Sequence, residues 1–187
     1  MFIQTEATPN PATLKFLPGQ QVMAAGTADF RSTESAARSP LAERLFMVDG
    51  VAGVFLGADF VSVTKADDKD WHVMKPALLG VIMEHFSSGR PAVLEDAGTE
   101  TAETVESAEE DREVVAQIQE LLDTRVRPAV AMDGGDIVFH GFDKGVVFLH
   151  MQGACSGCPS STATLKMGIE NMLKHYIPEV VEVRAVV

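Results

Sequence analysis

An acidic segment divides this chain into two parts and limits how it can fold. Residues 93–111 contain eight acidic residues, no basic residue and no aromatic residue. So much like charge with so little to bury is typical of a solvated linker. The blocks on either side, 1–92 and 112–187, each carry a net charge of only −2. We therefore expect two small domains joined by an acidic flexible linker, with an acidic surface helix as the alternative, although Asp96-Ala97-Gly98 would interrupt it.

The composition excludes several classes of protein. Hydrophobic residues make up 46% of the chain, yet no apolar run approaches the roughly 18 residues that a membrane span needs, so we expect a soluble protein that does not enter a membrane. The net charge of −12 argues against a general nucleic-acid binder, because phosphate contacts need clustered Lys and Arg. The first residues resemble neither a secretory signal nor a transit peptide. We expect a cytoplasmic, bacterial-type location, or the mitochondrial matrix if the chain is a processed organellar protein.

The first block has the pattern of an α+β domain. Leu14, Phe16 and the stretch 54–63 have the composition of strands. Ser39-Pro40 predicts a helix start, with a capping side chain followed by a proline at the first helical position. A longer helix is expected after Asp70, because apolar residues recur at steps of three and four until Gly89.

The second block is expected to have the order α-β-β-α-β. The expected elements are a helix from Val114 to the vicinity of Pro128, strands at 137–140 and 146–151, a helix from Pro159 to Pro178, and a last strand at 180–183. Residues 141–145 are few enough for a hairpin turn, so the first two strands should be antiparallel. The two blocks together predict an α+β protein made of two small α/β domains.

Two cysteines stand in the motif Cys155-Ser156-Gly157-Cys158-Pro159, and the chain has no others. This spacing argues against a disulfide framework and indicates a reducing compartment. Pro159 suits the first turn of the following helix, which places Cys158 at or near its N-cap. The helix dipole stabilises a thiolate there and lowers a cysteine pKa from about 8.5 to roughly 3.5–7.5. Gly153 and Gly157 let the backbone approach a bulky inorganic group, so the motif favours metal or cluster binding.

Four interpretations of this motif remain open at this point. Two inert, buried cysteines are the simplest. A thioredoxin-like thiol–disulfide oxidoreductase is the enzymatic alternative, although an expected β-hairpin rather than a β-α-β unit precedes the motif. Zinc would need two further ligands, for which His140 and His150 are the candidates. An iron–sulfur cluster takes four thiolates, so Cys155 and Cys158 would have to be pooled from two copies of the chain in a homodimer.

Two other features are interpreted without any chemistry. Asp133-Gly134-Gly135-Asp136 is expected to be a tight turn before a strand rather than a phosphate or metal site. Met74, Met83, Met167 and Met172 fall on apolar helical faces and are expected in the core.

Motifs in both blocks are shared with a known family. They are residues 133–136 (Asp-Gly-Gly-Asp) and 153–161 (Gly-Ala-Cys-Ser-Gly-Cys-Pro-Ser-Ser) in the second block, and residues 8–16, 39–42, 54–57 and 82–86 in the first. This combination resembles the Nfu/NifU family of iron–sulfur cluster scaffold proteins. The resemblance covers nearly the whole chain except the acidic linker.

The resemblance implies an iron–sulfur cluster scaffold or carrier rather than an enzyme. In that family a [4Fe–4S] cluster is bound between two protomers, and the two family cysteines correspond to Cys155 and Cys158; a [2Fe–2S] form stays open. The implied partners are a second copy of the chain, upstream cluster assembly proteins, and recipient apo-proteins that need iron–sulfur clusters. The N-terminal domain, which contains no cysteine, is implied to contribute to the recognition of partners.

Overall fold

The computed structural model describes residues 1–94, 109–156 and 159–186, except for the side chains of 159–161. The chain divides into two compact units, Met1–Thr99 and Glu100–Val187, each with its own hydrophobic core. Both units combine helices with a sheet, which confirms the expected fold class. Most of the expected linker, residues 95–108, lies outside the described residues. Among the described helices, none combines the length and apolar character needed to cross a membrane.

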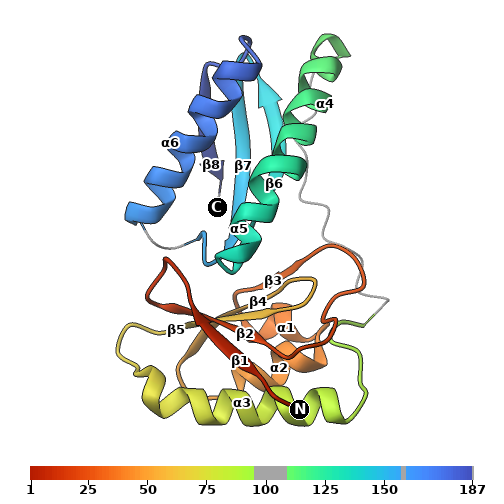
Figure 1. The fold of residues 1–187 in the computed structure, drawn as a ribbon, viewed down its shortest axis with the longest axis vertical. Coiled ribbons are helices and arrows are strands. Elements are labelled where there is room, and N and C mark those ends of the chain that lie inside the picture. Colours follow the sequence, from red (N-terminus) through yellow and green to blue (C-terminus); the bar gives the residue numbers. More distant parts are fainter. Residues whose placement is uncertain (95–108, 157–158, 187) are drawn as a thin grey trace. The chain divides into compact units, whose positions relative to one another are not determined.

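The described part of the first unit is one antiparallel sheet with three helices. Its elements are β1 (Gln4–Ala7), β2 (Thr13–Leu17), β3 (Ala28–Phe30), α1 (Thr33–Ala36), α2 (Pro40–Phe46), β4 (Val51–Leu56), β5 (Val61–Lys65) and α3 (Trp71–Ser87). The strands are ordered β1-β2-β5-β4-β3 across the sheet. The helices lie on one face of this sheet (Figure 1), and the core fills the space between.

Local sequence explains where the helices of this unit begin. Ser39 Oγ accepts a hydrogen bond from the N–H of Ala42 at 3.0 Å, and Pro40 is the first residue of α2. Asp70 caps α3 in the same way, because its carboxylate accepts from the N–H of His72 at 2.8 Å. Both helix starts that the sequence predicts are therefore confirmed.

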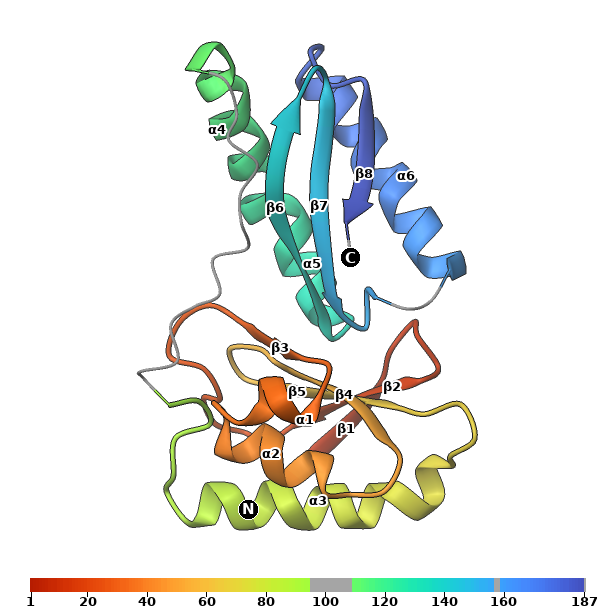
Figure 2. The same ribbon diagram turned by 180° about the vertical axis from the view of Figure 1, so that it is seen from behind.

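The second unit is a three-stranded sheet with helices on one face. Its elements are η1 (Glu109–Asp111, a 3₁₀ turn), α4 (Arg112–Leu121), η2 (Leu122–Val126, a π-helical turn), α5 (Arg127–Met132), β6 (Gly135–Asp143), β7 (Val146–Gly153), α6 (Pro159–Tyr176) and β8 (Glu182–Val186). β7 is central, antiparallel to β6 and parallel to β8. Figure 2 looks onto the face of this sheet that α4, α5 and α6 leave uncovered. The expected order α-β-β-α-β is confirmed.

Three boundaries in the second unit differ from the expected ones. The first helix continues through Pro128. The proline nitrogen has no N–H to donate, and the wide π-helical turn η2 just before it accommodates the missing backbone hydrogen bond. The hairpin strands are longer, since the turn consists only of Lys144 and Gly145, with φ of +48° and +84°. The last strand begins at Glu182, because the preceding Val181 donates its N–H to the carbonyl of Gly145 at 2.7 Å.

The four methionines expected in the core divide into two pairs. Met74 is buried, and Met172 is half-buried against the second core. Met83 and Met167 are 43% and 66% exposed, so the expectation was wrong for these two. Helical spacing places a residue only to within part of a turn, and a long flexible side chain at the edge of an apolar face reaches solvent.

A histidine is buried inside the first unit without a hydrogen bond. His85, near the end of α3, is fully buried, and among the described residues neither of its ring nitrogens has a hydrogen-bond partner. Burial lowers the pKa of His85 below its ordinary value of 6.5, and the positive charge of Arg44 lowers the pKa further. The folded unit therefore binds this proton less readily than the unfolded chain does.

We expect the first unit to lose stability as the pH falls below 6.5, because protons then bind the unfolded chain more tightly than the folded one. His85→Phe should flatten this dependence between about pH 5 and 7. Trp71, the only tryptophan of the chain, begins α3, so its fluorescence during thermal unfolding reports on this unit. His72→Phe is the matched control, since His72 is exposed on the same helix. An unchanged pH dependence in His85→Phe would contradict the prediction.

Candidate functional site

The cysteine loop and the Asp133–Asp136 turn meet at one end of the β6–β7 hairpin. Their register sets Gly135 opposite Gly153, at the end away from the Lys144–Gly145 turn. β7 leads directly into the loop, and β6 follows directly from the turn. Antiparallel pairing therefore brings together two motifs that are distant in the sequence.

Hydrogen bonds on both sides tie the loop to its neighbours. Ala154 donates its N–H to the carbonyl oxygen of Gly134 at 3.2 Å, which joins the loop to the turn before β6. Thr162, in the first turn of α6, donates its hydroxyl to the carbonyl oxygen of Cys155 at 3.0 Å. Gly134 and Gly153 have φ of +79° and +60°, a conformation that glycine adopts without steric cost. The first cysteine is thus held between a strand end, a turn and a helix start.

Cys155 is buried rather than exposed on the loop. Its exposed fraction is 7%, and it belongs to the core of the second unit. Burial raises the pKa of the Cys155 thiol to about 12, and the carboxylates of Asp133 and Asp136 contribute in the same direction. In this conformation the thiol is protonated at neutral pH, so a metal that binds its sulfur must displace the proton.

The low pKa expected at the helix start concerns the other cysteine. α6 begins at Pro159, as the sequence predicts. Cys158 itself, together with Gly157, lies outside the described residues. The pairing of Cys155 with Cys158 as ligands therefore stays a prediction.

Gly135 lies directly against the Cys155 side chain. A Cβ atom at this position would be 2.5 Å from Cys155 Sγ, 2.8 Å from the carbonyl oxygen of Gln152 and 3.0 Å from Cys155 N. Two of these three atoms belong to the backbone, so a larger residue would push the loop away from the sheet. The turn that we interpreted as having no chemistry therefore determines where Cys155 lies.

Asp136 holds this turn through a partly buried ion pair. Arg127 Nε and Nη2 donate to Asp136 Oδ1 and Oδ2 at 2.9 and 2.8 Å. Oδ1 also accepts from the N–H of Ile137 at 2.8 Å. Only 4% of the Asp136 side chain is exposed, against 38% of the Arg127 side chain. The hydrogen bonds to Asp136 raise the pKa of Arg127, and the pair connects α5 to β6.

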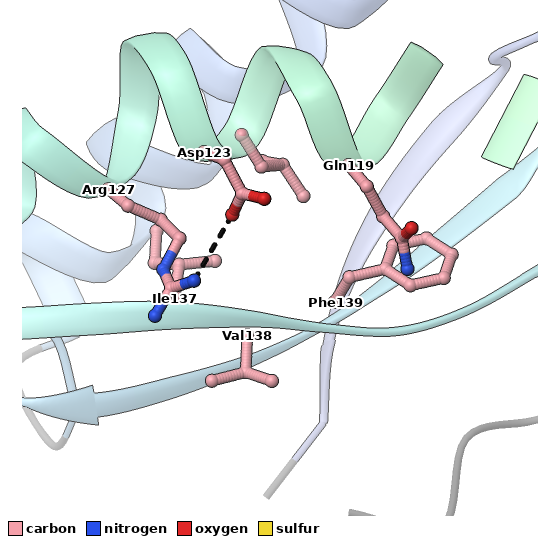
Figure 3. Close-up of a pocket in the computed structure, with 7 residues that line it drawn as sticks. Gln119, Asp123, Arg127, Ile137, Val138 and Phe139 are labelled. Atoms are coloured by element: carbon pink, nitrogen blue, oxygen red, sulfur yellow. Dashed lines mark hydrogen bonds and ion pairs between the residues drawn. The ribbon is translucent and has the colours of Figure 1, made fainter. Parts of the chain in front are cut away.

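A pocket of about 280 Å³ lies on the far side of Arg127, between the helical segment and β6 (Figure 3). Its lining residues are Gln119, Leu122, Asp123, Arg127, Ile137, Val138 and Phe139. Arg127 Nη1 donates to Asp123 Oδ1 at 3.1 Å, the contact drawn in Figure 3. Arg127 therefore has one buried partner on the side of the cysteine loop and one exposed partner at the pocket.

Comparison with known proteins shows the family to which this chain belongs. Two family models match the chain, "Scaffold protein Nfu/NifU N terminal" over residues 3–89 and "NifU-like domain" over residues 118–184. The "NFU1 iron-sulfur cluster scaffold homolog, mitochondrial" of Homo sapiens is 52% identical over 181 residues, which cover 96% of this chain and 70% of that protein. The chain belongs to the Nfu/NifU family of iron–sulfur cluster scaffold proteins.

Two further proteins to which this chain is similar are also named NifU-like. The "NifU-like protein 5, mitochondrial" of Arabidopsis thaliana is 56% identical over 182 residues, 96% of this chain and 66% of the relative. The chain thus spans about two thirds of the length of these relatives. A solution structure of a NifU-like protein from Saccharomyces cerevisiae matches 50% of this chain and 85% of its own, with 25% identity and a TM-score of 0.46. The family resemblance seen in the motifs is confirmed, whereas relatives named as mitochondrial do not support the expected cytoplasmic location.

Sequence reasoning missed the roles of three residues of this Nfu/NifU site. Gly135 packs against Cys155, and the next residue, Asp136, bonds Arg127, although we assigned the Asp133–Asp136 turn no chemistry. One signal was available in the sequence: Gly134 and Gly135 are two consecutive glycines, and a glycine beyond the one that a turn needs indicates a close approach by another part of the chain. No local sequence pattern indicates that the Arg127 side chain bonds Asp136.

The alternative interpretations of the motif fare less well. His140 is five residues along β6 from Gly135, about 17 Å in an extended strand, and the described residues contain no group of three or more His, Cys, Asp or Glu that could hold a metal ion. Zinc with His140 and His150 is therefore not supported. The thioredoxin alternative is not supported either, because an antiparallel hairpin precedes the loop and the matching families are scaffold families. Burial of Cys155 agrees with an inert cysteine, but the family match argues against one.

We expect Gly135→Ala to displace Cys155, because the nearest backbone atoms leave no room for a Cβ. The apo-protein should lose about 1–3 kcal/mol of stability, the usual cost of overpacking. In a Cys158→Ala background, where Cys155 is the only thiol, its modification by iodoacetamide should also become faster. Thermal unfolding and mass spectrometry measure the two effects.

The control for this change is Gly168→Ala in α6. Gly168 is exposed, and no atom lies within 4 Å of a Cβ placed there. Alanine favours a helix over glycine by about 1 kcal/mol, so this variant should be as stable as the wild type or more stable. If both variants behaved alike, the contact between Gly135 and Cys155 would not be the cause.

Proposed function

We propose that this chain accepts an iron–sulfur cluster, holds it between two copies of itself through Cys155 and Cys158 of each, and passes it to recipient apo-proteins. The observation that carries the proposal is the placement of Cys155, which is fixed between a strand end and a helix start, in a chain with only one other cysteine. Membership of a scaffold family supports a carrier rather than an enzyme. The cluster is then the cargo of the protein and not a resident cofactor.

The number of thiolates supports sharing between two copies. Iron–sulfur clusters are commonly held by four cysteine thiolates, and this chain has two cysteines. A symmetric pair supplies Cys155 and Cys158 twice, which completes the set for one [4Fe–4S] cluster. A [2Fe–2S] cluster would use the same four ligands, so the iron content per pair of chains distinguishes the two forms.

The way in which Cys155 is held suits repeated loading and release of a cluster. The hairpin, the Gly134 carbonyl and the Thr162 hydroxyl hold the loop at both ends, and these contacts do not involve the thiol. A ligand that is positioned before the cargo arrives loses less conformational freedom on binding. Ligands shared across two chains let the cluster leave when the pair separates.

The two units then have different tasks. Residues 112–187 bind the cluster, and residues 1–92, which have no cysteine to offer as a ligand, contribute to recognition of partners. The partners are the upstream assembly proteins that supply the cluster and the apo-proteins that receive it. Because the relatives are named as mitochondrial proteins, the mitochondrial matrix is the location that we favour.

Anaerobic reconstitution tests the ligand set. We expect about four iron and four sulfide per two chains, because two copies pool four thiolates around one cluster. Cys155→Ala and Cys158→Ala should each remove two of the four ligands and nearly all bound iron. Gly168→Ala, an exposed change in α6 that leaves both cysteines in place, should load like the wild type. Four iron per single chain, or zinc retained in place of iron, would refute the shared site.

The oligomeric state tests the sharing directly. A cluster that binds only the paired state should shift the monomer–dimer equilibrium toward the dimer. Analytical ultracentrifugation of the same preparation before and after loading should therefore show a larger dimer fraction when loaded. Cys155→Ala taken through the same loading reaction should sediment like the apo-protein. Equal dimer fractions with and without cluster would mean that the cluster does not bridge two chains.

A further inference from the structure

Arg127 links α5 to β6, the strand whose first residue, Gly135, lies against Cys155. Its side chain forms two hydrogen bonds to the buried Asp136 carboxylate, at 2.9 and 2.8 Å, and one to the exposed Asp123, at 3.1 Å. A planar guanidinium matches a carboxylate in this two-bond geometry, which a lysine cannot reproduce.

The π-helical turn η2 sets the position of this arginine. The N–H of Arg127 donates to the carbonyl of Leu122, five residues earlier, and Pro128 follows without an N–H of its own. The extra residue in this turn changes the direction of every side chain that follows it in the helix. From here the guanidinium lies against β6, as Figure 3 shows.

A short series of contacts connects Asp136 to the cysteine. Asp136 follows Gly135 in the chain, and its Oδ1 also accepts from the N–H of Ile137 at 2.8 Å, so the carboxylate holds the backbone at the start of β6. Gly135 in turn has no room for a Cβ against Cys155 Sγ. A displacement of Asp136 would therefore move the surface on which the Cys155 side chain lies.

We infer that Arg127 is a positioning residue, which acts through Asp136 and Gly135 to hold Cys155 ready for its cargo. Within the described residues its side-chain hydrogen bonds are to the carboxylates of Asp123 and Asp136, and so its effect on the thiol is indirect. The placement of Cys155 in the apo-protein is independent of the proposed function, whereas the effect on cluster retention rests on it.

The first arm of the test uses the apo-protein of this 187-residue chain with Cys158→Ala, so that Cys155 is the only thiol. Arg127→Met should raise the rate at which iodoacetamide modifies Cys155 by about tenfold or more, the factor expected from one lost charge-assisted hydrogen bond. Arg127→Lys should give an intermediate rate. Asp123→Ala removes only the exposed partner of Arg127 and should leave the rate within about twofold of the wild type.

A second control separates positioning from general stability. Ile118→Val shortens a buried side chain of α4 at a distance in sequence from the cysteine loop, and it lowers stability without touching the ion pair. It should leave the modification rate of Cys155 unchanged when measured well below the melting temperature. If Ile118→Val accelerated modification as much as Arg127→Met, or if Arg127→Met had no effect, the inference would be overturned.

The second arm uses loaded protein with both cysteines present. Loss of iron to a chelator should be about tenfold faster in Arg127→Met than in the wild type, with Arg127→Lys between them. The same rate of loss in all three would overturn the role in retention. If no protein took up a cluster while the first arm gave the expected rates, the proposed function would fail and the positioning of Cys155 would stand. Should Arg127→Met not fold, Arg127→Lys and Asp136→Asn carry both arms.

Discussion

The pairing of β6 with β7 is the interaction on which the site depends. Because the strands are antiparallel and joined by the two-residue turn Lys144–Gly145, the start of one and the end of the other must lie together, with Gly135 opposite Gly153. A shift by one residue would exchange the two faces of the strand and bury the wrong side chains. It would also take the glycine away from Cys155. The cost of exposing the apolar face of the strand therefore fixes the register, and the register places Gly135 next to Cys155.

Two carboxylates lie close to the thiol that we propose as a ligand. Burial raises the pKa of Cys155, and the carboxylates of Asp133 and Asp136 raise it further, which favours the protonated thiol. A buried carboxylate without a partner would be strongly unfavourable, and Arg127 supplies that partner through two hydrogen bonds. The arginine therefore stabilises the fold and offsets negative charge close to the ligand. One partly buried ion pair thus connects the stability of the second unit with the surroundings of Cys155.

Local signals in the sequence predicted local features well. The caps at Ser39 and Asp70 are formed by side chains that bond the next turn of the same helix, so a few consecutive residues contain the whole interaction. The helix was expected to run to the vicinity of Pro128, but it continues to Met132, because a π-turn before the proline accommodates it. Met83 and Met167 were wrongly placed in the core, because periodicity gives a face and not its exact width.

By itself, the sequence determined the two-block organisation, the α-β-β-α-β order of the second block, the family, and the count of two cysteines on which the proposal of a shared site rests. Each of these rests on composition, short-range spacing or the number of a residue type. Only the tertiary structure decided that Cys155 is buried against Gly135 and that Arg127 reaches Asp136. These contacts join a loop, a helix and a strand, and their energy depends on register and burial, which no stretch of neighbouring residues contains.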